Sequence, residues 1–253
     1  MDVIGIIPAR YSSTRFEGKV LADIFGKPMI QHVWERAKQA LILDELVIAC
    51  DDERVASVAK EFGAKVVLTS KSHVSGTDRI AEVINPLDVK VVVNIQGDEP
   101  LINPMMIDTV ARALIDNKEI PMATISKMIT NHNELIDPHV VKVVVDKNNF
   151  ALYFSRAAIP HLAYSSEVES PAYYKHIGLY AYTKDFLFTF KNLPVSNLEK
   201  IEKLEQLRVL EEGFKIKVIE TKCDTIGVDT PEDLVKVKEY LEREKFDARN
   251  QCK

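Results

Sequence analysis

The first part of the chain alternates short apolar strands with amphipathic helices, and this rhythm restricts the possible fold more than any other feature. Strand-type runs are expected at 3–7, 46–50, 65–68 and 89–95. Helical patterns follow them at 28–41, 53–62, 78–84 and 104–116. Such alternation is typical of a parallel sheet with helices on both faces. We therefore predict an α/β fold with a Rossmann-like, mostly parallel sheet.

The second half of the chain has a different rhythm. Strand-type runs are expected at 122–128, 140–146, 151–156 and 175–182, with few helices between them. They favour a smaller antiparallel or mixed extension, of the kind that often forms a substrate lobe or a dimer contact. A helix at 199–212, a strand at 215–220 and a last helix with Thr230 as N-cap and Pro231 in its first position complete the pattern.

Composition narrows the class of protein. Hydrophobic residues make up 46% of the 253 residues, enough for a large core, and the net charge of −5 argues against a surface that coats nucleic acid. The three cysteines have no CxxC spacing, which indicates reduced thiols. Without a repeat, a long linker, a signal-like start or a membrane-length apolar run, we expect a single domain (1–253) in the cytoplasm.

A basic loop follows the first strand. Residues 8–19 contain Arg10, Arg15 and Lys19 together with three hydroxyl side chains. Guanidinium forks, an ammonium and hydroxyls can surround a triphosphate. Because Lys19 is followed by Val20 rather than Ser or Thr, the loop is not a P-loop. A solvated basic loop is the competing interpretation.

Carboxylates stand at two other strand ends. Asp98 and Glu99 follow the most apolar strand, and Asp229 precedes the last helix. Ligands of open α/β sheets bind at the carboxyl ends of the strands, where such carboxylates can hold Mg²⁺. A turn cap for Asp98 and a favourable charge at the helix dipole for Asp229 are the alternatives. The residues alone thus indicate an α/β enzyme that handles a nucleotide with magnesium.

Weaker candidates for binding residues lie in the second half of the chain. Arg156 follows a strand, and His176 and Tyr180 are four apart in another strand, so they share a face. Glu205 and Gln206 fall in a charged helix, where a solvated face is the usual explanation.

Several strings, in order, resemble the family of 3-deoxy-manno-octulosonate (KDO) cytidylyltransferases, which are sugar nucleotidyltransferases. The matching strings are Ile7-Pro8-Ala9-Arg10 with Ser13, Arg15 and Lys19; Gly26-Lys27-Pro28; His73 to Arg79; Gln96-Gly97-Asp98-Glu99-Pro100; Tyr153 to Arg156; Lys175 to Tyr182; Leu204-Glu205-Gln206; and Gly227 to Asp233.

The resemblance implies a reaction and a role for each residue. The anomeric hydroxyl of KDO attacks the α-phosphorus of CTP, giving CMP-KDO and pyrophosphate. Arg10, Lys19, Asp98 and Asp229 would be catalytic, with Asp98 and Asp229 holding Mg²⁺. The CTP site would comprise Pro8, Ala9, Arg10, Ser13, Arg15, Lys19, Ser75, Thr77, Arg79, Gln96 and Asp98. The sugar site would comprise Gln96, Arg156, His176, Tyr180, Glu205 and Gln206.

The resemblance also implies the nucleotide-diphospho-sugar transferase fold, with a CTP-binding half at about 1–120 and a sugar-binding, dimerising half at 121–253. It implies a homodimer, a role in lipopolysaccharide or capsule synthesis, and no nucleic-acid or membrane partner. For His176 a hydrogen bond to the sugar is favoured over a general base. An 8-amino-KDO enzyme, an acylneuraminate cytidylyltransferase and a non-catalytic nucleotide-binding protein remain as alternatives.

Overall fold

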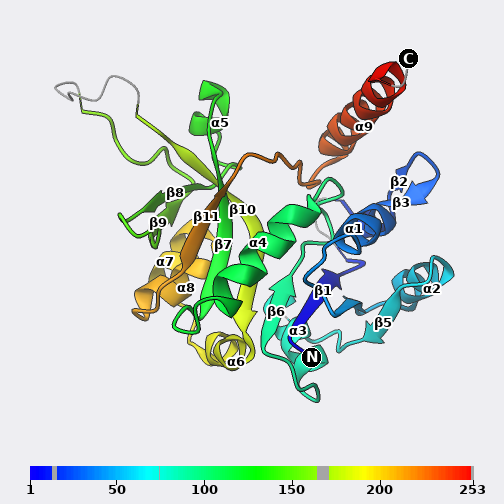
Figure 1. Cartoon of the computed structure of the whole chain (residues 1–253), viewed down its shortest axis with the longest axis horizontal. Coiled ribbons are helices and arrows are strands. Elements are labelled where there is room, and N and C mark those ends of the chain that lie inside the picture. Colours follow the sequence, from blue (N-terminus) through cyan, green and yellow to red (C-terminus); the bar gives the residue numbers. More distant parts are fainter. Residues whose placement is uncertain (13–15, 74, 164–170, 252–253) are drawn as a thin grey trace.

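A computed structural model describes residues 1–12, 16–73, 75–163 and 171–251 of the chain, with side chains described as far as residue 244. A nine-stranded sheet runs through the molecule in the order β11-β7-β10-β6-β1-β4-β5, and β8 and β9 extend it from β10 (Figure 1). The strands are β1 Val3–Ala9, β4 Glu45–Cys50, β5 Lys65–Leu68, β6 Val91–Asn94, β7 Met122–Met128, β8 Lys142–Val145, β9 Ala151–Ser155, β10 Tyr174–Thr183 and β11 Lys217–Thr221. A separate hairpin pairs β2 Asp23–Ile24 with β3 Lys27–Pro28.

Strand direction differs between the two halves of the sheet. β1 pairs in parallel with β4 and β6, and β4 with β5. β10 is antiparallel to β6, β7 and β8, whereas β11 returns parallel to β7. The predicted fold class, a mixed and mostly parallel sheet with an antiparallel extension, is confirmed. The extension continues the main sheet, because β10 bonds directly to β6.

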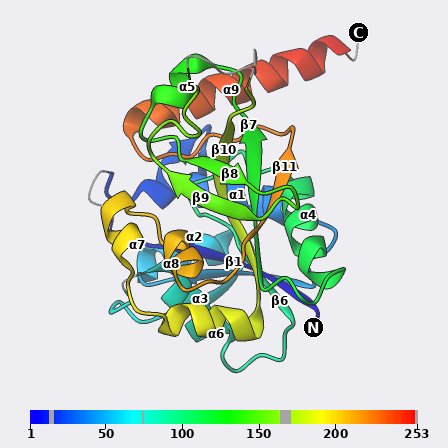
Figure 2. The same ribbon diagram turned by 90° about the vertical axis from the view of Figure 1, so that its left-hand side faces the viewer.

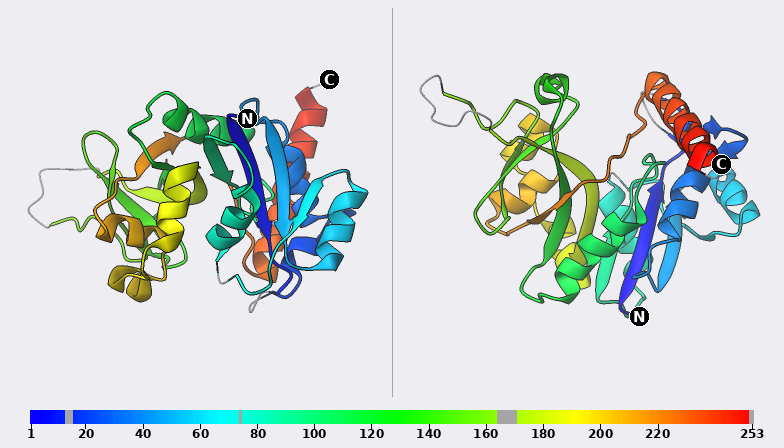
Figure 3. Two further views of the ribbon diagram at one scale, coloured as in Figure 1. Left: turned by 90° about the horizontal axis from the view of Figure 1, so that it is seen from below. Right: turned by 45° about the horizontal axis from the view of Figure 1, so that its top comes forward.

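Helices cover both faces of the sheet. They are α1 Met29–Ala37, α2 Glu53–Glu61, α3 Gly76–Ile84, α4 Pro104–Ile115, α5 His132–Ile136, α6 Lys184–Asn192, α7 Asn197–Glu202, α8 Gln206–Glu211 and α9 Pro231–Gln251, with a 3₁₀ turn η1 at Lys19–Leu21. One core cluster joins α1, α2 and α4 to the sheet, and a second joins α3, α6 and α8 (Figure 2). A third, smaller cluster lies under α9, beside the β2–β3 hairpin (Figure 3). None of the described helices is long and apolar enough to cross a bilayer.

Two expected helices differ from the structure. The helix expected at 28–41 ends at Ala37, so Leu41 lies beyond it and is 89% exposed. The helix expected at 199–212 is two helices, because Lys203 adopts the left-handed conformation (φ 56°) between α7 and α8. The helix α6, which follows the Thr183 cap, was not predicted, although the strand expected before it ended at Tyr182.

Candidate active site

Three strand ends meet around Pro8 at the end of β1. Gly97 lies so close to this residue that an added Cβ would stand 2.9 Å from the Pro8 carbonyl oxygen. Gly76, the first residue of α3, lies against the Pro8 ring, where an added Cβ would be 3.5 Å from Cγ. The loops after β1 and β6 and the start of α3 therefore converge at one edge of the sheet, as ligand sites of α/β sheets do.

Lys19 joins the two carboxylates predicted to bind metal. Its Nζ donates to Asp98 Oδ2 at 2.6 Å and to Asp229 Oδ1 at 3.1 Å, and it also donates to the Val228 carbonyl at 3.2 Å. Burial lowers the pKa of Lys19, but the two carboxylates outweigh this effect and the pKa is raised. Residues far apart in sequence thus bring two carboxylates to one cation.

The donor set fits a hard divalent cation. Both carboxylate oxygens surround a single cationic atom, and oxygen ligands are those that Mg²⁺ prefers. The described residues contain no group of three or more His, Cys, Asp or Glu side chains that could hold a metal ion. The protein would supply Asp98 and Asp229, and the remaining ligands would be phosphate oxygens or water, as is usual for Mg²⁺.

Asp229 is held in place through Glu99. The Thr225 hydroxyl donates to Glu99 Oε2, and the Val228 amide donates to the Asp98 carbonyl at 2.9 Å. Burial raises the pKa of Glu99 to about 7, with the Thr225 hydrogen bond opposing it and the negative charges of Asp98 and Asp229 adding to it. The segment before α9 is therefore bonded to the loop after β6.

A cavity of about 280 Å³ is lined by residues of α3, β6 and β10 and of the turn between α7 and α8. Five of the predicted ligand-binding residues line it: Thr77, Gln96, Tyr180, Glu205 and Gln206. Gln96 is two positions before Asp98. The loop that follows β6 therefore supplies both a residue that lines the cavity and a carboxylate of the metal-type cluster.

The cavity presents polar groups that suit a hydroxylated ligand. Among the described residues, the buried Nε2 of Gln206 has no hydrogen-bond partner. Thr77 Oγ1 donates to Glu205 Oε2 at 3.3 Å, across the cavity. Burial raises the pKa of Glu205, although the Thr77 hydrogen bond opposes this. Buried amide donors are usually hydrogen-bonded, so the Gln206 amide is a candidate donor to an acceptor on a bound ligand.

His176 lies next to the cavity and is neutral. Its ring contacts the Tyr180 ring, with centroids 5.3 Å apart, at a place where the register of β10 against β7 shifts between Ile177 and Tyr180. Burial lowers its pKa to about 3. The Thr124 hydroxyl donates to the Leu179 carbonyl at 2.8 Å, so at its 3.0 Å contact with His176 Nε2 it accepts, which assigns the proton to Nε2. This leaves Nδ1 as a hydrogen-bond acceptor.

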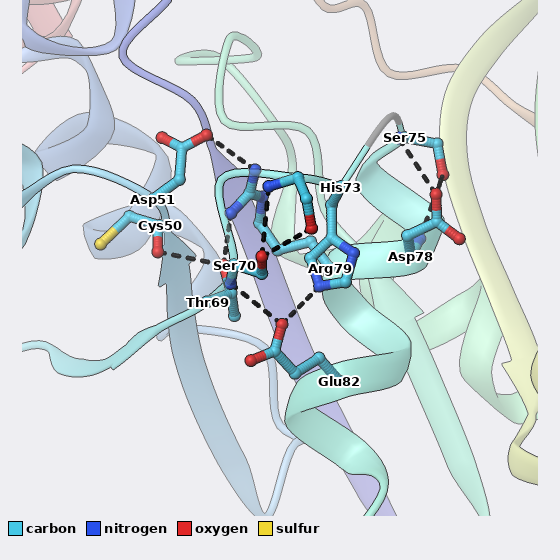
Figure 4. Close-up of polar contacts among 10 residues, drawn as sticks. Cys50, Asp51, Thr69, Ser70, His73, Ser75, Asp78, Arg79 and Glu82 are labelled. Atoms are coloured by element: carbon cyan, nitrogen blue, oxygen red, sulfur yellow. Dashed lines mark hydrogen bonds and ion pairs between the residues drawn. The ribbon is translucent and has the colours of Figure 1, made fainter.

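Arg79, predicted to read cytosine, is fully buried, and Figure 4 shows its guanidinium facing Asp51 and Thr69. Its Nη2 donates to Asp51 Oδ2 at 2.8 Å and its Nη1 donates to the Thr69 hydroxyl. Asp51 Oδ1 in turn accepts from the Tyr11 amide at 3.4 Å. The guanidinium thus binds the ends of β4 and β5 and, through Asp51, the loop after β1.

The other predicted residues occupy varied positions. Ser75 caps α3 in a reciprocal capping box with Asp78, so its hydroxyl already has a structural role. Arg10 follows β1 and is half-buried, and Pro8 and Ala9 end that strand. Arg156 follows β9 and is not among the residues that line the cavity. Ser13 and Arg15 lie outside the described residues.

Sequence reasoning missed several residues of the site. Asn94, Tyr182 and Lys203 line the cavity, and Asp51 is the partner of Arg79. Tyr182 could have been found, since it follows Tyr180 by two positions in the same strand. Lys203 could not, because an unbroken helix was expected there.

Comparison with known proteins identifies the family of this chain. A family model described as cytidylyltransferase matches residues 4–218. The 3-deoxy-manno-octulosonate cytidylyltransferase of Syntrophotalea carbinolica is 53% identical over 95% of this chain and 99% of its own length. The enzyme of the same name from Geotalea uraniireducens is 49% identical over 96% of this chain and 100% of its own.

Solved structures agree as well. One of CMP:2-keto-3-deoxy-manno-octonic acid synthetase complexed with CTP has a TM-score of 0.90 and 43% identity, covering 96% of this chain and 100% of its own. A cytidylyltransferase of Leptospira borgpetersenii, at 17% identity and a TM-score of 0.64, over 94% of this chain and 85% of its own, shares the fold. The resemblance found in the sequence is thereby confirmed, and the chain belongs to the family of 3-deoxy-manno-octulosonate cytidylyltransferases.

Proposed function

We propose that the protein transfers CMP from CTP to the anomeric hydroxyl of KDO and releases pyrophosphate. The observation that carries the proposal is the cluster of Lys19, Asp98 and Asp229 beside a cavity lined by Gln96, Tyr180, Glu205 and Gln206. The cluster suits a metal-bound triphosphate, and the cavity suits a hydroxyl-rich sugar. The family likeness supports both substrates.

The chemistry is a substitution at phosphorus. The hydroxyl oxygen of KDO forms a bond to the α-phosphorus of CTP while the bond from that phosphorus to the bridging oxygen of the β-phosphate breaks. Pyrophosphate leaves, and the hydroxyl proton passes to solvent. Such a transfer depends on positioning and on charge stabilisation.

Cationic groups would stabilise the leaving group. Arg10 and Lys19 would face the triphosphate, where negative charge grows as pyrophosphate departs. Mg²⁺ held by Asp98 and Asp229 would neutralise phosphate charge and lower the pKa of the attacking hydroxyl. Because its pKa is about 3, His176 is neutral at physiological pH and suits a hydrogen bond to the sugar. A general base on the protein is not required.

The sugar would be read by hydrogen bonds and by charge. The Gln206 amide, the Glu205 carboxyl and the Tyr180 hydroxyl would bind sugar hydroxyls, and Arg156 would form a fork with the sugar carboxylate. Ser13, Arg15, Ser75 and Thr77 would complete the CTP site. A homodimer and a cytoplasmic location belong to the same proposal and rest on the family likeness and the sequence.

The test is pyrophosphate release from CTP and Mg²⁺ with KDO, 8-amino-KDO or N-acetylneuraminate. Asp98→Asn should reduce release with KDO at least about 100-fold, the usual cost of removing a group that stabilises the transition state. Asp88→Asn is the matched control, because Asp88 is exposed just before the opposite end of β6. It should leave the rate unchanged.

Each alternative outcome has a clear meaning. Release with another sugar in preference to KDO would reassign the sugar and keep the CTP site. Activity retained in Asp98→Asn would contradict the metal role. If folded wild-type protein bound CTP but released no pyrophosphate with any of the sugars, the proposed enzymatic activity would be contradicted.

A further inference from the structure

Glu202 joins two segments of the proposed sugar site. It is the last residue of α7, and its carboxylate meets the end of β9. Ser155 Oγ donates to Oε1 at 2.6 Å, and the Arg156 amide donates to Oε2 at 2.9 Å. The contact is reciprocal, because Arg156 Nε donates to the Glu202 carbonyl at 2.8 Å. Both carboxylate oxygens and the backbone of Glu202 therefore hold the Arg156 region.

Arg156 is held from its other side by Lys142. The Lys142 side chain is buried in β8, and its Nζ donates to the Arg156 carbonyl at 2.7 Å and to the Asp137 carbonyl at 2.8 Å. Arg156 Nη1 donates to the Pro138 carbonyl at 2.9 Å. The amide, the carbonyl, Nε and Nη1 of Arg156 are thus all bonded. Within the described part of the chain, Nη2 has no hydrogen-bond partner.

The helix that carries Glu202 belongs to a rigid pair. Arg208 on α8 donates to both carboxylate oxygens of Glu199 on α7, at 2.7 Å each. The left-handed Lys203 turns the chain directly after Glu202, and Glu205 and Gln206 follow at the cavity. A displacement of Glu202 relative to β9 would therefore move Arg156 relative to Glu205 and Gln206.

We infer that Glu202 is a positioning residue for a sugar that carries a carboxylate. It sets the Arg156 guanidinium relative to the turn that presents Glu205 and Gln206, so that charge and hydroxyls are recognised in one fixed geometry. Preorganisation of this kind raises affinity because less ordering remains to be done on binding. The ligand class rests on the proposed function. The joint itself, meaning the hydrogen bonds of Glu202 to Ser155 and Arg156, rests on the contacts above.

The test compares Glu202→Ala with Ser155→Ala. An Ala side chain has no acceptor, so Glu202→Ala leaves the Arg156 amide and the Ser155 hydroxyl without the carboxylate that both bind. We expect the KM for KDO to rise about tenfold, equivalent to about 1.4 kcal/mol, while the KM for CTP stays within about twofold. Ser155→Ala removes one contact to Glu202 and leaves all the Arg156 contacts. It should therefore leave the KM for KDO near the wild-type value.

A purely structural role would give a different result. Equal increases of both KM values, or no change in either, would overturn the inference. Hydrogen exchange of the Arg156 amide provides a readout that needs no sugar, since protection at this amide should fall in Glu202→Ala and persist at Arg208. If the wild-type protein used no KDO, the proposed function would fail while exchange still tested the joint. Unchanged protection at Arg156 would then refute the joint.

Discussion

At the scale of single residues, the site depends on charged groups that are held close together. Asp98 and Asp229 would repel each other, and the Lys19 ammonium between them offsets that repulsion. Glu99 lies next to this group, and its burial, together with the negative charges of Asp98 and Asp229, raises its pKa to about 7. The same carboxyl binds Thr225, so it connects the two carboxylate-bearing segments.

Glu99 makes stability depend on pH. Its folded-state pKa of about 7 is above the ordinary 4.5, so its contribution to stability is fully present below pH 4.5 and is lost as the pH rises through about 7. Glu99→Gln keeps an acceptor for Thr225 and removes the ionisation. In EDTA, which removes divalent cations, the free energy of unfolding of Glu99→Gln should equal that of the wild type near pH 5. At pH 8 it should exceed the wild-type value by on the order of 2 kcal/mol. Denaturant unfolding at both pH values measures this, and a constant difference would contradict it.

At the scale of elements, the loop after β6 can approach β1 because Gly97 has no side chain. An added Cβ would lie 2.9 Å from the Pro8 carbonyl and 3.3 Å from Ile30 Cδ1, and backbone cannot easily move away. Asp98 follows immediately, so its position depends on this close approach.

Gly97→Ala should therefore lower the free energy of unfolding by about 1–3 kcal/mol, the usual cost of overpacking. It should also lower kcat, because the loop that carries Asp98 must shift. Gly76→Ala is the matched control: its Cβ would meet Pro8 at an ordinary 3.5 Å, so the expected loss of stability is small. Thermal unfolding of both variants measures the difference in stability, and equal melting temperatures would refute the argument.

At the scale of the whole molecule, α9 fixes one of the two metal-type carboxylates. Asp229 stands two residues before this helix, which packs on the β2–β3 hairpin and α1 through the small cluster of Ile24, Met29, Val237 and Leu241 (Figure 3). Asp98 lies in the loop that follows β6 of the main sheet. The relative position of the two carboxylates thus depends on this small cluster as well as on the large ones.

Val237→Ala should loosen this attachment. Val237 is fully buried, so the loss of two methyl groups should reduce the free energy of unfolding by about 1–3 kcal/mol. The Mg²⁺ concentration for half-maximal activity should rise, because Asp229 is less well held. Val235→Ala, at a position 55% exposed on the same helix, should change neither quantity. A destabilised Val237→Ala protein with an unaltered Mg²⁺ requirement would show that the packing of α9 does not position the metal site.

The amino-acid sequence was enough to predict the alternating α/β order, the parallel half of the sheet and the positions of Lys19 and Asp98 in loops that follow strands. These follow from local periodicity and from the rule that parallel strands end at one edge. Through its likeness to a family, the sequence also marked Thr77 and Gln96 for CTP and Gln96, Tyr180, Glu205 and Gln206 for the sugar; the structure brings all five to one cavity.

Tertiary structure alone decided the rest. The left-handed Lys203 breaks a helix whose local pattern is continuous, because Leu204 and Leu207 are buried against the second core cluster while Glu205 and Gln206 line the cavity. The burial of Arg79 against Asp51 and the joining of Arg156 to Glu202 are contacts between residues 28 and 46 positions apart. Contacts over such distances are set by packing, whereas periodicity reports only on neighbours within a turn or a strand.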